Sequence, residues 1–300
     1  MIATTKTINP VSRRALREHV KGFYDIQMLR IAMGNRICAN FHARLGREPG
    51  QKAEELDAEA QGLLQSLIQQ WEKITDGIVD TRIRSMKFEL GGKQIIADRA
   101  EIEMVRAYIK MVDVETSEMK VIKFYTENHP LWPAFLQEVK GVGPTMAGVI
   151  LSEIDIAKCR YVSSLWKYAG VDVGPDGAGR SRKSEHLVDQ TYLDKEGREA
   201  TKKGITFNPF LKTKLCGVLA DQFNRRPADG YGKMLRDYKH RIENHPNHQD
   251  KTKGHRQNMA KRYAVKMFLR DLYLAWRPLE GLPTEPDYHE AKLGHTHSAA

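Results

Sequence analysis

Residues 136–151 read LQEVKGVGPTMAGVIL, and the fold prediction starts from this stretch. Gly141 is suited to a left-handed turn that ends one helix, and Val142 is suited to turn inward between two helices. Gly143-Pro144 is suited to open the next helix, whose first N–H groups attract a phosphate. The pattern is typical of a helix-hairpin-helix that grips the DNA backbone, with an ordinary glycine corner as the alternative. Its candidate DNA-binding residues are Lys140, Gly141, Val142, Gly143 and Thr145.

Long helical patterns fill the sequence before this stretch. Apolar residues recur at helical spacing over residues 12–45, 51–81 and 98–127, with polar residues between them. We expect residues 51–127 to form an antiparallel helical pair of coiled-coil character that makes the protein a homo-oligomer. Burial of the same stripes inside one helical bundle is the open alternative.

The expected fold class is mainly α, in three parts. His129-Pro130 ends the third helical pattern, because a residue before proline disfavours the α region. The parts are a helical or coiled-coil region at 1–130, an α-helical domain with the helix-hairpin-helix at 131–280, and a flexible tail at 281–300.

Positive charge is concentrated in one part of the chain. The 300 residues carry a net charge of +10, and residues 180–270 alone hold 22 basic and 10 acidic side chains, a net of +12. Such a surplus indicates a polyanionic partner, most often nucleic acid, although solvated helix faces would have the same composition. The candidate phosphate-binding cations there are Arg180, Arg182, Lys183, Lys212, Lys214, Arg256, Lys261 and Arg262.

Residues 128–171 resemble the opening of the C-terminal domain of the insertion-sequence 110 family of bacterial transposases. The family pattern is a leucine helix, a Gly-Ile/Val-Gly-Pro hairpin, an Ala-rich helix that ends in Glu-Ile, and a Leu-x-x-Tyr-Ala-Gly motif. The matching residues are Leu136, Gly141, Val142, Gly143, Pro144, Ala147, Glu153, Ile154, Leu165, Tyr168, Ala169 and Gly170. The resemblance implies a DNA-binding protein of a mobile-element, phage or recombination setting.

The resemblance has two departures. The family's N-terminal RuvC-like nuclease domain, which holds metal on an Asp-Glu-Asp-Asp site, has no counterpart in the helical patterns before residue 130. The family's serine nucleophile follows the Tyr-Ala-Gly motif in a loop, and here that loop contains Ser181 and Ser184 among basic residues. Nearby cations would activate a serine and stabilise a charged transition state. These two serines are the candidate catalytic residues, and a loop that only touches phosphates is the alternative.

We expect the chain not to cleave DNA alone, because the sequence shows no general base for either serine. The expected cofactor is none, or Mg²⁺ if the chain is a transposase or recombinase. The expected partner is DNA, with branched or structured DNA included. Structured RNA is an open alternative, because members of the resembled family use a structured RNA. His245 and His248 are the tightest histidine pair, and we interpret them as loop residues rather than metal ligands.

The spacing of the cysteines and the hydropathy of the sequence indicate the cellular compartment in which the protein is found. Cys38, Cys159 and Cys216 are far apart, so a disulfide scaffold is excluded and a reducing compartment is indicated. The sequence has no apolar segment that would span a membrane and no signal-peptide core. The expected location is the cytoplasm of a bacterial or phage-infected cell, in association with the nucleoid.

Overall fold

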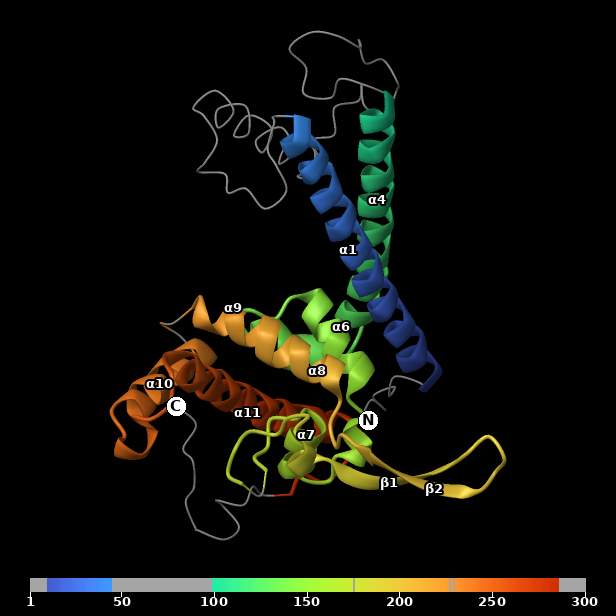
Figure 1. The fold of residues 1–300 in the computed structure, drawn as a ribbon. Helices are drawn as coiled ribbons and strands as arrows, with labels where there is room; N and C mark the ends of the chain where they lie inside the picture. Colours follow the sequence, from blue (N-terminus) through green and yellow to red (C-terminus); the bar gives the residue numbers. More distant parts are fainter. Residues whose placement is uncertain (1–9, 45–98, 175, 227, 229, 286–300) are drawn as a thin grey trace. The chain divides into compact units, whose positions relative to one another are not determined.

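The computed structural model describes residues 10–44, 99–174, 176–226, 228 and 230–285. The chain divides into two compact units, one made of Met1–Arg17 with Ile122–Ala300 and the other of Glu18–Val121. The described part is mainly helical, which confirms the predicted fold class (Figure 1). The helix expected at 51–81 lies outside the described residues. None of the described helices is both long and apolar enough to cross a membrane.

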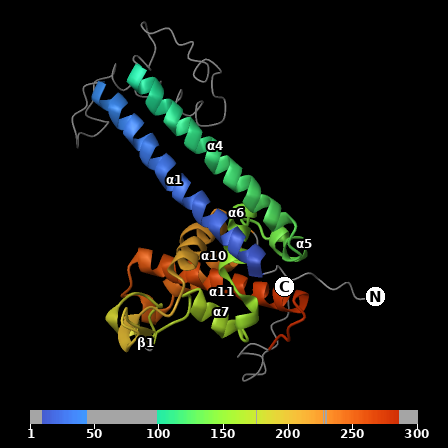
Figure 2. The ribbon, with the colours of Figure 1, turned by 90° about the vertical axis from the view of Figure 1, so that its right-hand side faces the viewer.

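Two long helices make up the described part of the Glu18–Val121 unit. In this unit α1 (Pro10–Arg44) and α4 (Arg99–Glu127) lie side by side and antiparallel, in both views of the ribbon (Figures 1 and 2). Val20 and Val105 are among the apolar residues buried here. Arg30 pairs with Glu115, which joins the middle of the two helices. The periodicity therefore predicted both helices. The antiparallel pair expected within residues 51–127 has its first helix outside the described residues, so that pair and self-association through the N-terminal helices stay predictions.

The other unit is built around α11 (Lys253–Leu279), with α10 (Gly230–Glu243) packed along it. One stripe of α11 is buried at helical spacing, as expected for a helix with a single apolar face. Its buried residues include Ala260, Ala264, Val265, Phe268, Leu269, Leu272, Tyr273 and Trp276. Arg277 is also buried, and its guanidinium donates to the carbonyls of Ile156 (3.1 Å) and Cys159 (2.8 Å). These two hydrogen bonds connect the end of α11 to the 3-10 turn Ile156–Lys158.

A further helical run crosses this core. It comprises α8 (Pro209–Thr213), a π-helical turn at Lys214–Leu219 and α9 (Ala220–Asn224). Asn208 caps α8 by accepting the N–H of Leu211, and its Nδ2 donates to the Glu153 carboxylate at 2.5 Å. The Tyr168 hydroxyl donates to the Glu153 carbonyl at 2.8 Å. Glu153 and Tyr168, two residues of the family pattern, thus tie α6 (Pro144–Glu153) to α7 (Val162–Tyr168) and α8.

The glycine stretch differs from the predicted hairpin in its first half. The expected helix before Gly141 is instead a short helix, α5 (Leu131–Ala134), and a 3-10 turn at Leu136–Glu138. The break lies at Phe135, whose φ of −153° and ψ of −55° leave the helical region, so no continuous helix precedes Gly141. The second helix, α6 (Pro144–Glu153), is present as predicted, with Pro144 in its first turn.

A β-hairpin interrupts the helical unit after the glycine stretch. β1 (Val188–Leu193) pairs antiparallel with β2 (Glu199–Gly204), with Thr191 opposite Thr201. The turn is fixed by Asp194, whose Oδ1 accepts the N–H groups of Glu196 and Arg198. The sequence analysis predicted helices alone here, and the hairpin is an addition to that prediction.

Candidate nucleic-acid interface

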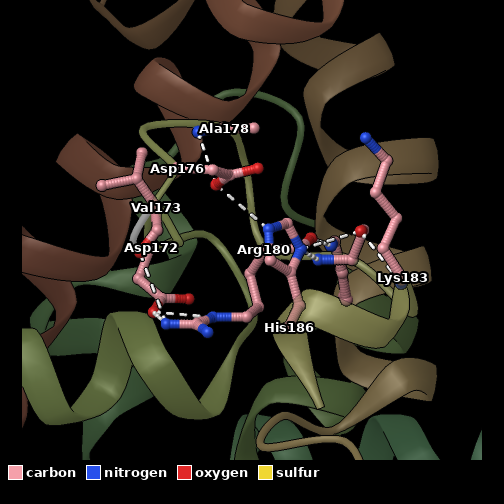
Figure 3. Close-up of polar contacts among 9 residues, drawn as sticks. Asp172, Val173, Asp176, Ala178, Arg180, Lys183 and His186 are labelled. Carbon is pink, nitrogen blue, oxygen red and sulfur yellow. Dashed lines mark hydrogen bonds and ion pairs between the residues drawn. The ribbon is translucent and has the colours of Figure 1, made fainter.

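The loop after α7 (Val162–Tyr168) carries both predicted serines and forms a connected polar cluster (Figure 3). The Ser181 Oγ lies 2.9 Å from His186 Nδ1. The His186 Nε2 lies 3.1 Å from Asp176 Oδ1. His186 is 1% exposed, so its ring is shielded from water. Ser181, His186 and Asp176 therefore form a continuous chain of hydrogen bonds within one loop, which we call the relay.

The backbone fixes the tautomer of His186. The N–H of Ser181 donates to Nδ1 at 3.0 Å, so Nδ1 presents a lone pair and the ring proton is on Nε2. Nε2 then donates to Asp176, and the Ser181 backbone N–H and the Ser181 hydroxyl share the single lone pair of Nδ1. Nδ1 can take the hydroxyl proton once the backbone N–H no longer occupies that lone pair.

Asp176 is held in its charged form. The N–H of Ala178 donates to its Oδ1 at 3.0 Å, and this bond, followed by the bond from His186, lowers the pKa of Asp176. Ser184 differs from Ser181, because it is exposed and begins the 3-10 turn Ser184–His186. Of the two candidate serines, the structure places Ser181 in the relay.

Four cations from distant parts of the chain gather beside this loop. Arg180 donates to Asp172 Oδ2 through Nε (3.1 Å) and Nη2 (2.8 Å), which raises the Arg180 pKa. Lys212 from α8 donates to the Arg180 carbonyl. Arg262 and Lys266 from α11 complete the group, which we call the cation cluster. Three of its members, Arg180, Lys212 and Arg262, are predicted DNA-binding residues.

Free energy is required to bury the members of the cation cluster next to one another. Burial lowers the pKa of Lys212, and the positive charge of Arg262 lowers it further. Burial and Arg262 lower the pKa of Lys266 in the same way, while Asp172 opposes both shifts. Half-buried cations that repel one another are stabilised by an added anion. The arrangement is therefore an electrostatic site for a negatively charged group.

The Arg262 guanidinium can occupy its position because Gly179 has no side chain. A Cβ atom built on Gly179 would lie 1.1 Å from Arg262 Nη1, so the guanidinium rests against the loop backbone. Within the described part of the chain, no residue gives this guanidinium a hydrogen bond or an ion pair. Its donors are thus available to a ligand, and the glycine is what lets them reach this position.

The glycine hairpin forms a second group of predicted residues. Gly141 has φ +105°, the left-handed region that the sequence predicted for it. Val142 is buried, as expected for a residue that turns inward. Gly143 is exposed, and a Cβ atom there would meet nothing within 4 Å. No described side chain caps α6, so the N–H groups of its first turn, from Thr145 onward, have no side-chain acceptor.

Two further predicted cations, outside the cation cluster, also have structural partners. Lys261 pairs with Asp221 at 2.5 Å. Arg256 Nη1 donates to the His248 carbonyl at 3.2 Å, which braces the turn before α11. Both remain candidates for DNA contact, but each first contributes to the local fold.

The remaining predicted cations lie at the surface or against a ring. Arg182 and Lys183 are exposed beside Ser181, and the N–H of Lys183 donates to Ser181 Oγ at 3.3 Å. Lys214 Nζ lies 5.3 Å from the Phe210 ring centroid, and burial lowers the Lys214 pKa. Lys140 is exposed next to the glycine hairpin.

Three residues of this site, His186, Asp176 and Lys266, were not predicted from the sequence. His186 is five residues after Ser181. A histidine this close in the sequence was the available signal for a general base that acts on the serine. Lys266 joins the cation cluster only because α11 packs against α7, where Trp166 Nε1 donates to the Lys266 carbonyl at 3.0 Å. In the described ranges, no three His, Cys, Asp or Glu side chains gather as metal ligands.

A comparison with protein families gives a match that spans the loop of this site. Residues 134–192 match the model of the transposase IS116/IS110/IS902 family. The match begins in α5 and ends in β1, so it includes the glycine hairpin, α6, α7 and the whole Ser181–His186 loop. It confirms the resemblance drawn from the sequence. No curated protein and no solved structure matches the chain.

Proposed function

We propose that this transposase-related chain binds DNA, largely through the phosphate backbone, in a mobile-element, phage or recombination setting. The cation cluster carries the proposal. Arg180 is bonded to Asp172, whose charge also acts on Lys212 and Lys266. Burial lowers the pKa of both lysines, and repulsion from Arg262 lowers it further. A backbone phosphate offsets that repulsion and accepts hydrogen bonds from Arg262.

The glycine hairpin supplies a second phosphate contact in this proposal. The N-terminus of α6 has uncapped N–H groups and a partial positive charge from the helix dipole. Gly143 leaves room for a phosphate to approach the backbone closely. Lys140 stands next to it and adds a charge that any DNA sequence attracts.

Two glycine substitutions test this binding proposal. Gly179→Ala places a methyl group where the Arg262 guanidinium lies, and a flexible arginine can move away at little cost to folding. Gly143→Val fills the open space at α6 without a left-handed φ to strain. We expect each variant to bind labelled duplex DNA about tenfold more weakly in fluorescence anisotropy, the loss of roughly one charged hydrogen bond.

Gly254→Ala is the matched control, because Gly254 lies in the first turn of α11 and its Cβ would meet nothing within 4 Å. It should bind DNA as the wild type does. Circular dichroism establishes that all three variants fold. The proposal fails if the wild type binds no DNA at low salt, or if both test variants retain full affinity.

The relay of Ser181, His186 and Asp176 favours a second candidate function, DNA strand cleavage. In this candidate the Ser181 Oγ forms a bond to phosphorus as His186 Nδ1 accepts the hydroxyl proton. The bond from phosphorus to the departing sugar oxygen breaks, and that oxygen takes a proton from water. Asp176 stabilises the imidazolium that results. Arg182 and Lys183 supply charge beside the reacting group.

A nicking assay separates cleavage from binding alone. Labelled duplex, hairpin and four-way-junction DNA are incubated with the chain, with and without Mg²⁺. Cleavage by this relay predicts nicking that Ser181→Ala abolishes, that His186→Gln strongly reduces and that Ser184→Ala leaves unchanged. If the wild-type chain does not nick, or if Ser181→Ala still nicks, the candidate is wrong and the binding proposal is unaffected.

A further inference from the structure

A cavity of about 330 Å³ lies between the Val173–Gly179 loop, α10 and α11. This volume is at the lower end of the range for small-ligand pockets. The charged residues of its described lining are Lys251, Arg262, Lys266 and one acid, Asp176. Asp176 is already bonded to His186, so the cavity presents mainly positive charge.

One wall of the cavity is aromatic. The rings of Tyr238 on α10 and Tyr263 on α11 stack with centroids 4.0 Å apart and planes 5° apart. The Arg241 guanidinium lies 4.6 Å from the Tyr238 centroid, and it must lie on the face that Tyr263 does not cover. Both faces of Tyr238 are therefore occupied. Among the described residues, no further ring or cation stacks on Tyr263.

We propose that this cavity binds a single unpaired nucleotide of a nucleic acid. The base stacks on the face of Tyr263 opposite Tyr238, and the phosphate lies between Arg262 and Lys266. The proposal rests on the proposed nucleic-acid binding and adds to it the form of nucleic acid that this site takes.

The shape of the site favours an unpaired nucleotide over an intact duplex. The bases of a duplex are stacked on one another and present only their edges, so a concave aromatic wall cannot stack on them. A base that has left the stack offers a π face, which an aromatic side chain binds without regard to sequence. Cations on the same wall would hold the adjoining phosphate.

The test compares three labelled DNA probes that differ at one position. They are a perfect duplex, the same duplex with one bulged nucleotide, and a duplex whose bulge is abasic. We expect the wild-type chain to bind the bulged duplex about tenfold more tightly than the other two in fluorescence anisotropy, the effect of one stacked base. The same three probes made in RNA show which nucleic acid supplies the better ligand.

Tyr263→Leu keeps the apolar bulk of the wall but removes the stacking face. It should lose the preference for the bulge and keep the wild-type affinity for the perfect duplex. Tyr161→Leu, an exposed tyrosine outside this lining, is the control and should keep the preference.

The abasic probe tests the inference on the unmutated chain, so the result does not depend on the folding of a variant. Equal binding of bulged and abasic probes, in both DNA and RNA, would overturn the inference and leave the proposed DNA binding intact. Loss of binding to every probe would refute the proposed function itself.

Discussion

Raising the salt concentration from 50 to 200 mM should weaken duplex DNA binding by roughly a thousandfold, the loss typical of six or more phosphate contacts. Each neutralised phosphate releases about one condensed counterion, and added salt opposes that release. Residues 180–270 have a net charge of +12, and this stretch includes all four members of the cation cluster. The glycine hairpin adds contacts outside the stretch.

Fluorescence anisotropy titrations at four or five salt concentrations give the slope of log K against log salt. A thermal unfolding curve at each concentration is the control, because it shows whether salt has changed the fold instead of the binding. A slope near zero would contradict a backbone-binding mode and would favour recognition of base edges.

The helices could be predicted from the sequence because their signal is local. Apolar residues at 3.6-residue spacing identify α1 and α4 whatever they pack against. The first half of the glycine hairpin differs from the prediction because the chain leaves the helical region at Phe135, and the leucine pattern carries no signal of that break. The β-hairpin was missed because its strands are mostly exposed and carry no alternation of apolar residues. The Asp194-x-x-Gly197 turn was the available signal.

The site could be predicted only in part. Arg180 and Ser181 follow from the family resemblance and from local charge. The cation cluster required α8 and α11 to meet the loop, and a count of charges along the chain cannot show which of them meet. The placement of Arg262 depends on the missing side chain of Gly179, which is a property of tertiary packing.

Lowering the pH from 7 to 4 should destabilise the helical unit that carries the glycine hairpin, through His129. His129 is 3% exposed, and burial lowers its pKa from 6.5 to about 4. Its Nδ1 accepts the N–H of Leu131 at 3.0 Å, and its ring meets Trp276 edge to face. The neutral ring therefore joins the end of α4 to α5 and α11, directly before Lys140 and the hairpin.

The direction in which pH changes the free energy of unfolding follows from proton binding to His129. Between pH 6.5 and 4 the unfolded chain protonates His129 while the folded chain does not, so the free energy of unfolding rises with pH across this window. The contribution of His129 is fully present above the unfolded pKa and decreases by about 3 kcal/mol as the pH falls to the folded pKa. Urea unfolding at pH 7, 5.5 and 4.5 measures it. Other groups titrate too, so the reference is His129→Asn, whose side-chain oxygen can accept the Leu131 N–H but does not titrate. The wild type should lose more stability than this variant as the pH falls, and parallel pH profiles would show that His129 is not the group responsible.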